Sequence, residues 1–483
     1  MADTAVQAKP AEPEGEKNLS NKELKELKKK EKAAKRAAQK EKNGITVEQQ
    51  RQLADEKKKS SQSAASNTAS NLKKQLNQTL IITDKKVPHL FGHLETREQR
   101  NASSPAISHI VHPAIIALTL KYSSYNVVGS SSRLVNMLRV FKQVIADYKT
   151  PENTTLTRHL TGHLSHQIEF LKSGRPLSVS MGNAIRWLKQ EISHVSIDIS
   201  ELQAKELLCQ KIDDFLREKV ELSDQLIVES AAKHVTSGAT ILTYGHSQVL
   251  EELFKFCAVE QGKKFNLVIV DSRPLFEGKK LLRHLSQTKS TDSLGEEVPI
   301  TQKYITIHYV LLNALSSTLL DDVDCVFLGA HAMLSNGRLF SRVGTAMIAM
   351  MCHTRNIPVL TCCESIKFSD KVQLDSVTSN ELADPNDLIN NTNSRKPPQK
   401  KTFALEQFLK QSNLEKSKDK KESFDETKNV DEPLQNWKTL QALNILNIMY
   451  DLTPPEYINK VITELGALPP SSVPVILREY KST

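Results

Sequence analysis

From residue 240 onward the chain alternates between short apolar runs and segments with helical spacing, and this alternation limits the folds open to it. The apolar runs read ATILTY, FNLVIVD, YITIHYV, DCVFLG and PVLTCC, and segments such as SQVLEELFKFCAVEQG lie between them. Strands separated by helices at this spacing predict βαβ units and a parallel, doubly wound sheet. Because each run is almost continuously apolar, we expect helices to cover both faces of the sheet.

The preceding part of the chain has a different period. Several consecutive segments between residues 105 and 237 carry apolar residues at helical spacing, the first of them starting near Pro113. The sequence therefore predicts an α/β protein. An all-helical domain (105–237) is followed by a Rossmann-like domain with a doubly wound parallel sheet (238–483), and residues 79–104 link the helical domain to the tail.

Three polar segments interrupt or precede these domains. Residues 1–78 are rich in lysine and end in a run of serine, alanine and asparagine, which predicts a disordered basic tail. The inserts at 286–298 and 390–432 are expected to be mobile loops in the α/β domain. The run after the second insert is again apolar, so we expect the chain to return and complete the fold.

The formal net charge of +9 raises the possibility of nucleic-acid binding. Much of that excess lies in the tail, where lysines alternate with glutamates and no aromatic residue offers a base-stacking surface. Direct nucleic-acid binding is therefore not the favoured interpretation, although an RNA- or ribosome-binding protein acting through the tail stays as an alternative. No apolar run reaches the roughly 18 residues of a membrane span, and MADTAVQAKP does not resemble a signal peptide. We therefore expect a cytosolic protein with no membrane contact.

The six cysteines form no CxxC pair and no regular disulfide framework. We interpret them as reduced, packed thiols, and predict no metal and no cofactor.

Polar residues follow the predicted strands, at the edge where ligands bind in parallel sheets. Glycines there let backbone N–H groups approach an anion, and arginines supply charge. Neither GxGxxG after the first strand nor GxxxxGK[ST] anywhere in the chain is present. The candidate anion or sugar-phosphate crevice comprises Arg273, Gly329, His331, Asn336, Gly337 and Arg342.

The segment GAHAMLSNGRLFSRVGT resembles a loop of the methylthioribose-1-phosphate and ribose-1,5-bisphosphate isomerases. The resemblance implies that these isomerases carry a proton-transfer aspartate at the position of His331 and a reactive cysteine at the position of Gly245. Isomerisation by proton transfer needs a positioned acid and base. The substitutions therefore predict a crevice with no catalytic residue, with a diverged isomerase or a metabolite-binding protein as the alternative.

The same scaffold without the catalytic pair resembles the regulatory subunits of eukaryotic translation initiation factor 2B, a guanine-nucleotide exchange factor, and most closely their delta branch. The matching segments are HPAIIALTLKYSS, GRPLSVSMGNAIRWLKQEI, VDSRPLFEGKKLL, LGAHAMLSNGRLFSRVGTA, VPVLTCCESIKF, SNELADPNDL and YDLTPPEYINKVITELGALPPSSVPVILR.

This resemblance implies a regulatory subunit that is not itself an enzyme, in a two-fold symmetric decamer of alpha, beta, gamma, delta and epsilon subunits with the exchange activity in epsilon. It also implies binding to the alpha subunit of initiation factor 2 and detection of its phosphorylation. A phosphoserine reader needs an exposed face with basic residues. The candidate contacts are the basic Arg175, Arg186 and Lys189, together with the apolar Met181 of the same segment. The apolar C-terminal run is expected to pack against beta and the symmetry-related half.

Overall fold

The computed structural model describes residues 86–102, 110–196, 198–291, 297–389, 434 and 437–482. These residues fall in one compact unit, Gln75–Thr483. The predicted tail (1–78) and the insert at 390–432 lie outside the described residues. In the described part, no helix combines the length and apolar character that crossing a bilayer requires.

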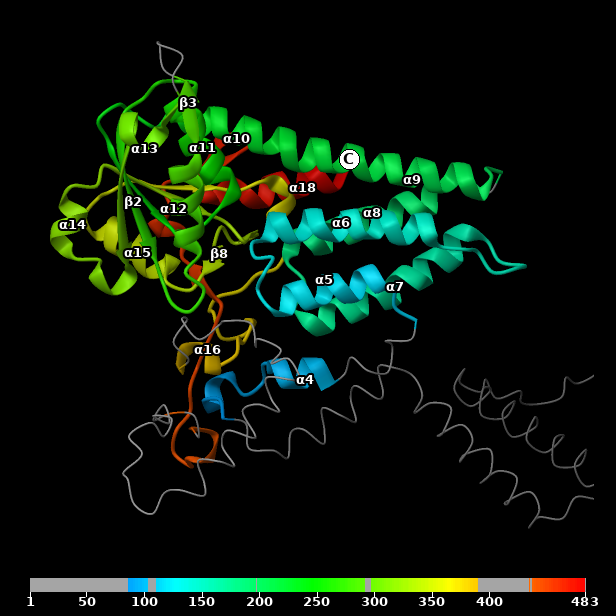
Figure 1. Ribbon diagram of the computed structural model, residues 1–483. Coiled ribbons are helices and arrows are strands. Elements are labelled where there is room, and N and C mark those ends of the chain that lie inside the picture. Colours follow the sequence, from blue (N-terminus) through cyan, green and yellow to red (C-terminus); the bar gives the residue numbers. More distant parts are fainter. Residues whose placement is uncertain are drawn as a thin grey trace, which may run out of the picture. The chain divides into compact units, whose positions relative to one another are not determined.

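Helices occupy most of the described chain up to residue 232, and Figure 1 shows α5 to α9 grouped beside the sheet. Local signals set several starts: the His112 side chain accepts from the Ala114 amide ahead of Pro113, and the Ser178 and Ser200 hydroxyls cap two later helices. The elements are η1 (His89–Phe91), α4 (Arg97–Ala102), α5 (Pro113–Ser123), α6 (Ser130–Asp147), α7 (Leu156–Gly174), α8 (Val179–His194), α9 (Glu201–Leu216), the π-helical η3 (Arg217–Leu222) and α10 (Ser223–Ala232).

A seven-stranded sheet follows, in the order β13-β12-β9-β6-β1-β2-β5. All neighbours in it are parallel except β12 and β13. The six parallel strands have the order of a Rossmann domain. The chain adds strands on one side of β1 and then, from β6 onward, on the other side, so the switch point lies between β1 and β6. The strands are β1 (Thr240–Tyr244), β2 (Phe265–Asp271), β5 (Ile305–Leu311), β6 (Cys325–Gly329), β9 (Val359–Cys362), β12 (Lys460–Thr463) and β13 (Gly466–Leu468).

Helices cover both faces of this sheet, which confirms the predicted fold class (Figure 1). One apolar core joins the sheet to α10, α11 and α12, and the other joins it to α14 and α15. The covering and connecting helices are α11 (Gln248–Val259), α12 (Glu277–Gln287), α13 (Ile300–Lys303), η4 (Leu312–Ala314), α14 (Ser317–Asp321), α15 (Thr345–Thr354), η5 (Ser365–Lys367), α16 (Asn386–Ile389), η7 (Trp437–Thr439), η8 (Pro455–Tyr457), η9 (Pro470–Ser472) and α18 (Val473–Ser482).

The structure differs from the sequence prediction in two segments of the α/β domain. The insert at 286–298, expected to be a loop, contains strand β3 (Lys289–Thr291) paired with β4 (Glu297–Pro299). The segment after β6 forms a hairpin, β7 (Ala332–Leu334) and β8 (Leu339–Arg342), in a second sheet ordered β10-β7-β8-β11. In that sheet β10 is Phe368–Ser369 and β11 is Tyr450–Thr453.

The C-terminal run supplies β11, β12, β13 and α18. Its apolar residues, such as Tyr450, Val461 and Ile462, are buried in the chain's own sheets. Internal packing therefore explains most of the apolar character that the sequence analysis assigned to a contact with other subunits.

Candidate functional site: a closed crevice at the strand ends

A small cavity lies at the switch point between β1 and β6. It brings together Gly329, His331 and Arg342 of the predicted crevice, with Tyr450 from β11 and the first residues of α6. Its volume is about 70 Å³, whereas ligand pockets usually measure about 300–1,000 Å³. A sugar phosphate therefore does not fit without rearrangement.

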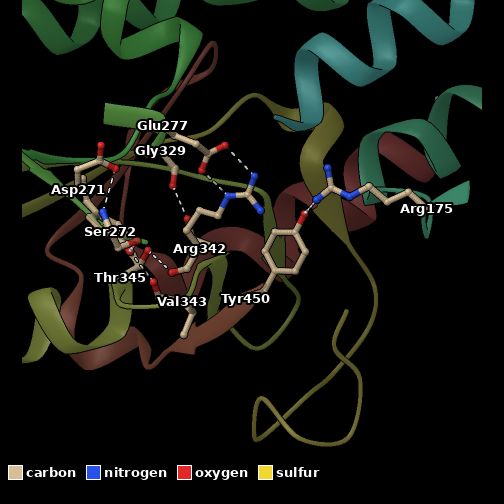
Figure 2. Close-up of polar contacts among 11 residues, drawn as sticks. Arg175, Asp271, Ser272, Glu277, Gly329, Arg342, Val343, Thr345 and Tyr450 are labelled. Carbon is tan, nitrogen blue, oxygen red and sulfur yellow. Dashed lines mark hydrogen bonds and ion pairs between the residues drawn. The ribbon is translucent and has the colours of Figure 1, made fainter. Parts of the chain in front are cut away.

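The arginine of this cavity is already paired. Arg342 donates from Nε to Glu277 Oε2 at 2.6 Å and from Nη2 to Glu277 Oε1 at 2.8 Å, as Figure 2 shows. Burial disfavours ionisation of Glu277, but the charge and hydrogen bonds of Arg342 outweigh it and hold the Glu277 pKa below its usual range. This bidentate pair uses the Nε–Nη2 edge of the guanidinium, while Arg342 Nη1 is buried with no hydrogen-bond partner among the described residues.

His331 occupies the position that the isomerase resemblance assigns to an aspartate. Its ring lies 4.3 Å from the Tyr450 ring and 5.8 Å from the Phe340 ring, measured between centroids. Burial, followed by the charges of Arg133 and Arg342, lowers the pKa of His331 well below its ordinary value. The imidazole is therefore neutral near pH 7, and no carboxylate stands in its place to transfer a proton.

Arg175 does not lie on the surface, in contrast to the role predicted for it. It is 1 % exposed, and its Nε donates to Glu381 Oε1 at 2.7 Å. Its Nη2 donates to the Tyr450 hydroxyl at 3.0 Å, so Tyr450 lies between the two arginines in Figure 2. The residue follows directly on α7, where a charged side chain looks exposed in the sequence, but Glu381 supplies a buried partner from 206 residues away.

The other three candidate contacts divide between core and surface. Met181 is fully buried in the helical core, so it cannot touch a partner in this conformation. Arg186 is exposed and donates to Asn183 Oδ1 at 2.6 Å. Lys189 is half-buried and donates to the Ser165 hydroxyl of α7 at 3.1 Å. Arg186 is the one residue of the four that is exposed.

The remaining crevice candidates lie elsewhere. Asn336 and Gly337 form the turn of the β7–β8 hairpin, where the Asn336 amide donates to the Gln373 carbonyl at 2.8 Å and Gly337 has a positive φ of 73°. Arg273 lines a neighbouring cavity of about 200 Å³ that also contacts Arg342. The hairpin explains the separation, because it carries its turn away from the strand ends.

A third ion pair lies near the cavity, in the segment that follows β9, and a serine of the helical part contacts it. Lys367 Nζ lies 2.6 Å from Glu364 Oε2, and both side chains are at most 4 % exposed. The Ser131 hydroxyl of α6 donates to Glu364 Oε1 at 3.0 Å. The sequence analysis gave no role to Glu277 or Glu381, whose arginine partners lie 65 and 206 residues away along the chain.

Three comparisons place this fold among known proteins. The model of the initiation factor 2 subunit family matches residues 126–470. The translation initiation factor eIF2B subunit delta of Schizosaccharomyces pombe is 39 % identical over 479 residues, which cover 96 % of this chain and 91 % of that protein.

Among solved structures, a chain of the tetrameric eIF2B beta2-delta2 complex from C. thermophilum superposes with a TM-score of 0.58 and 28 % identity, covering 79 % of this chain and 98 % of that one. The 5-methylthioribose 1-phosphate isomerase of Pyrococcus horikoshii OT3 reaches a TM-score of 0.53 at 16 % identity, covering 76 % and 88 %, and shares the fold alone. The chain therefore belongs to the initiation factor 2 subunit family, and within it to the delta subunits of translation initiation factor eIF2B.

Proposed function

We propose that this chain is a non-catalytic regulatory subunit that works in the eIF2B complex in the cytosol. In this role it joins alpha, beta, gamma and epsilon subunits in a two-fold symmetric decamer whose exchange activity lies in epsilon. It contacts the alpha subunit of initiation factor 2 and distinguishes its phosphorylated form.

The observation that carries the non-catalytic role is the small volume of the crevice, together with the paired or neutral state of its polar side chains. Arg342 is held by Glu277, His331 is kept neutral by burial and its cationic neighbours, and the cavity measures about 70 Å³. An isomerase active site needs room for its substrate and groups that exchange protons. The ion pairs here stabilise the fold around the strand ends.

The surface most suited to assembly lies around β5 and α15, and we call it the β5–α15 face. Met347 and Met350 on α15 are 41 % and 45 % exposed. Within the described residues β5 pairs only with β2, so its outer edge is open. Methionine adapts well to partner surfaces. Half-buried apolar residues of the same region pack against the core below: Val310, Leu312, Leu315, Leu319, Met351 and Tyr457.

We assign this face to the beta subunit, because the C. thermophilum structure that superposes on the chain is a complex of beta and delta. The double variant Met347→Glu/Met350→Glu places two charges on the face and should abolish co-purification with beta. Leu202→Glu, at a 75 % exposed position on α9, is the matched control and should leave the complex intact. Retention of beta by the double variant would refute the assignment.

The regulatory role is tested on the assembled complex. The tagged chain should purify with four stoichiometric companions, and the complex should accelerate nucleotide release from initiation factor 2. Phosphorylation of the alpha subunit should reduce that rate. Because Arg186 is exposed on α8, Arg186→Glu should weaken this inhibition and leave the exchange rate on the unphosphorylated factor unchanged. A protein that purifies alone would contradict the proposal.

A further inference from the structure

Beside the crevice, the side chains of two histidines and a glutamate converge on one another, and the proposed regulatory function does not use them. His246 follows β1, Glu251 lies on α11, and His284 lies in the last turn of α12. His246 Nε2 and His284 Nδ1 each lie 2.8 Å from the same oxygen, Glu251 Oε2. Across the described ranges, these three residues are the one group of three histidine, cysteine or acidic side chains whose donor atoms all lie within 4.8 Å of one another.

The spacing of these atoms is close to that of a metal site. Zinc binds histidine nitrogen and carboxylate oxygen at about 2.0–2.2 Å in a tetrahedron, which puts neighbouring ligand atoms about 3.3 Å apart. Both nitrogens already lie 2.8 Å from the carboxylate oxygen, so each contact needs to open by only about half an ångström. The two nitrogens lie within 4.8 Å of each other, so all three donor atoms already converge on one point.

The surroundings orient the carboxylate. Lys255 Nζ lies 2.6 Å from the other carboxylate oxygen, Glu251 Oε1, and so leaves Oε2 facing the two imidazoles. The Glu251 side chain is 9 % exposed and that of His284 is 36 % exposed, so the group is set into the protein yet open to water on one side.

We propose that His246, Glu251 and His284 form a binding site for a divalent transition metal, with Zn²⁺ as the ion that two imidazoles and one carboxylate fit best. The three side chains supply one ligand atom each, and water takes the fourth position. The bound ion ties the loop after β1 to α12. Sequence spacing did not show this site, because its ligands stand five and 33 residues apart on three separate elements.

The test uses the full chain, freed of metal with a chelator and titrated with ZnCl₂ against a chromogenic competitor, and separately with CoCl₂. We expect one equivalent of Zn²⁺ per chain, the visible absorption of tetrahedral Co²⁺, and a Zn²⁺-dependent rise in the thermal midpoint. His246→Gln and His284→Gln keep a side-chain amide that donates to Glu251, and each should weaken binding by about tenfold or more. His353→Gln, at an exposed histidine on α15, is the matched control and should bind as the unmodified chain does.

A second variant keeps the test decisive if the histidine variants fold poorly. Glu251→Gln removes the charge of the ligand carboxylate and should weaken Zn²⁺ binding by about tenfold or more. The proposal is overturned if the unmodified chain takes up no more Zn²⁺ than the His246→Gln/His284→Gln double variant. Unchanged Zn²⁺ affinity in Glu251→Gln also counts against it, because the carboxylate would then play no part in binding.

Discussion

Replacement of Arg175 by alanine tests whether this residue stabilises the fold or reads a partner. Arg175 and Glu381 are 2 % and 4 % exposed at the side chain and lie 2.7 Å apart. Removing one partner of a buried pair leaves an uncompensated charge, and this typically costs about 3–5 kcal/mol. The pKa of Glu381 is lowered because Arg175 and Arg133 outweigh the effect of its burial. Without Arg175 that carboxylate stays buried with its strongest partner gone.

Urea unfolding, followed by circular dichroism, measures the free energy of unfolding of three variants relative to the unmodified chain. Arg175→Ala should lose about 3–5 kcal/mol, whereas the double variant Arg175→Met/Glu381→Leu, which removes both charges and keeps apolar volume, should lose much less. Arg186→Ala is the matched control at an exposed arginine and should change the free energy by no more than about 0.5 kcal/mol. An Arg175→Ala chain as stable as the control, with weaker binding to initiation factor 2, would refute the reasoning and restore the surface role.

Three further predictions address the crevice and its surroundings. A β-carbon on Gly329 would lie 2.6 Å from Ser247 Cβ, so Gly329→Ala should lower the free energy of unfolding in urea by about 1–3 kcal/mol. Gly162 lies inside α7 and a β-carbon there would have no atom within 4 Å, so the control Gly162→Ala should raise the free energy of unfolding by about 0.5–1 kcal/mol. Burial, reinforced by the charge of Glu364, raises the pKa of Asp224 from 3.8 to about 8. The folded chain therefore binds the extra proton between those values and loses stability as the pH rises through them; Asp224→Asn should flatten this slope, and an equal slope in both chains would contradict it. Ribose 1,5-bisphosphate should leave the thermal midpoint unchanged, and a concentration-dependent rise would show that the crevice opens to a ligand.

The strands of the main sheet were predictable wherever the chain carries an uninterrupted apolar run. All five predicted runs became parallel strands, because burial on both faces requires near-continuous apolar sequence. Strands β12 and β13 were missed, since each is short and prolines and polar residues flank them. The β7–β8 hairpin was missed for a related reason: its strands have three and four residues, and the glycines of the segment suggested a loop.

The candidate site was less predictable because its contacts are distant in the sequence. Gly329 and His331 meet because they lie at the end of β6, and the β7–β8 hairpin returns Arg342 to the same cavity. The pairing of Arg175 with Glu381 and of Arg342 with Glu277 spans 206 and 65 residues. A charged residue looks the same in the sequence whether its partner is solvent or a buried carboxylate.

The polar contacts between the helical part and the sheet have a mechanical consequence. The Asn183 amide on α8 donates to the carbonyls of Ile366 and Phe368 at 2.7 and 3.0 Å, and Ser131 on α6 holds Glu364. These bonds fix α6 and α8 to the segment that follows β9, next to the strand ends. We therefore expect that a displacement of α8 would also move this segment and change the position of the strand ends to which it is connected.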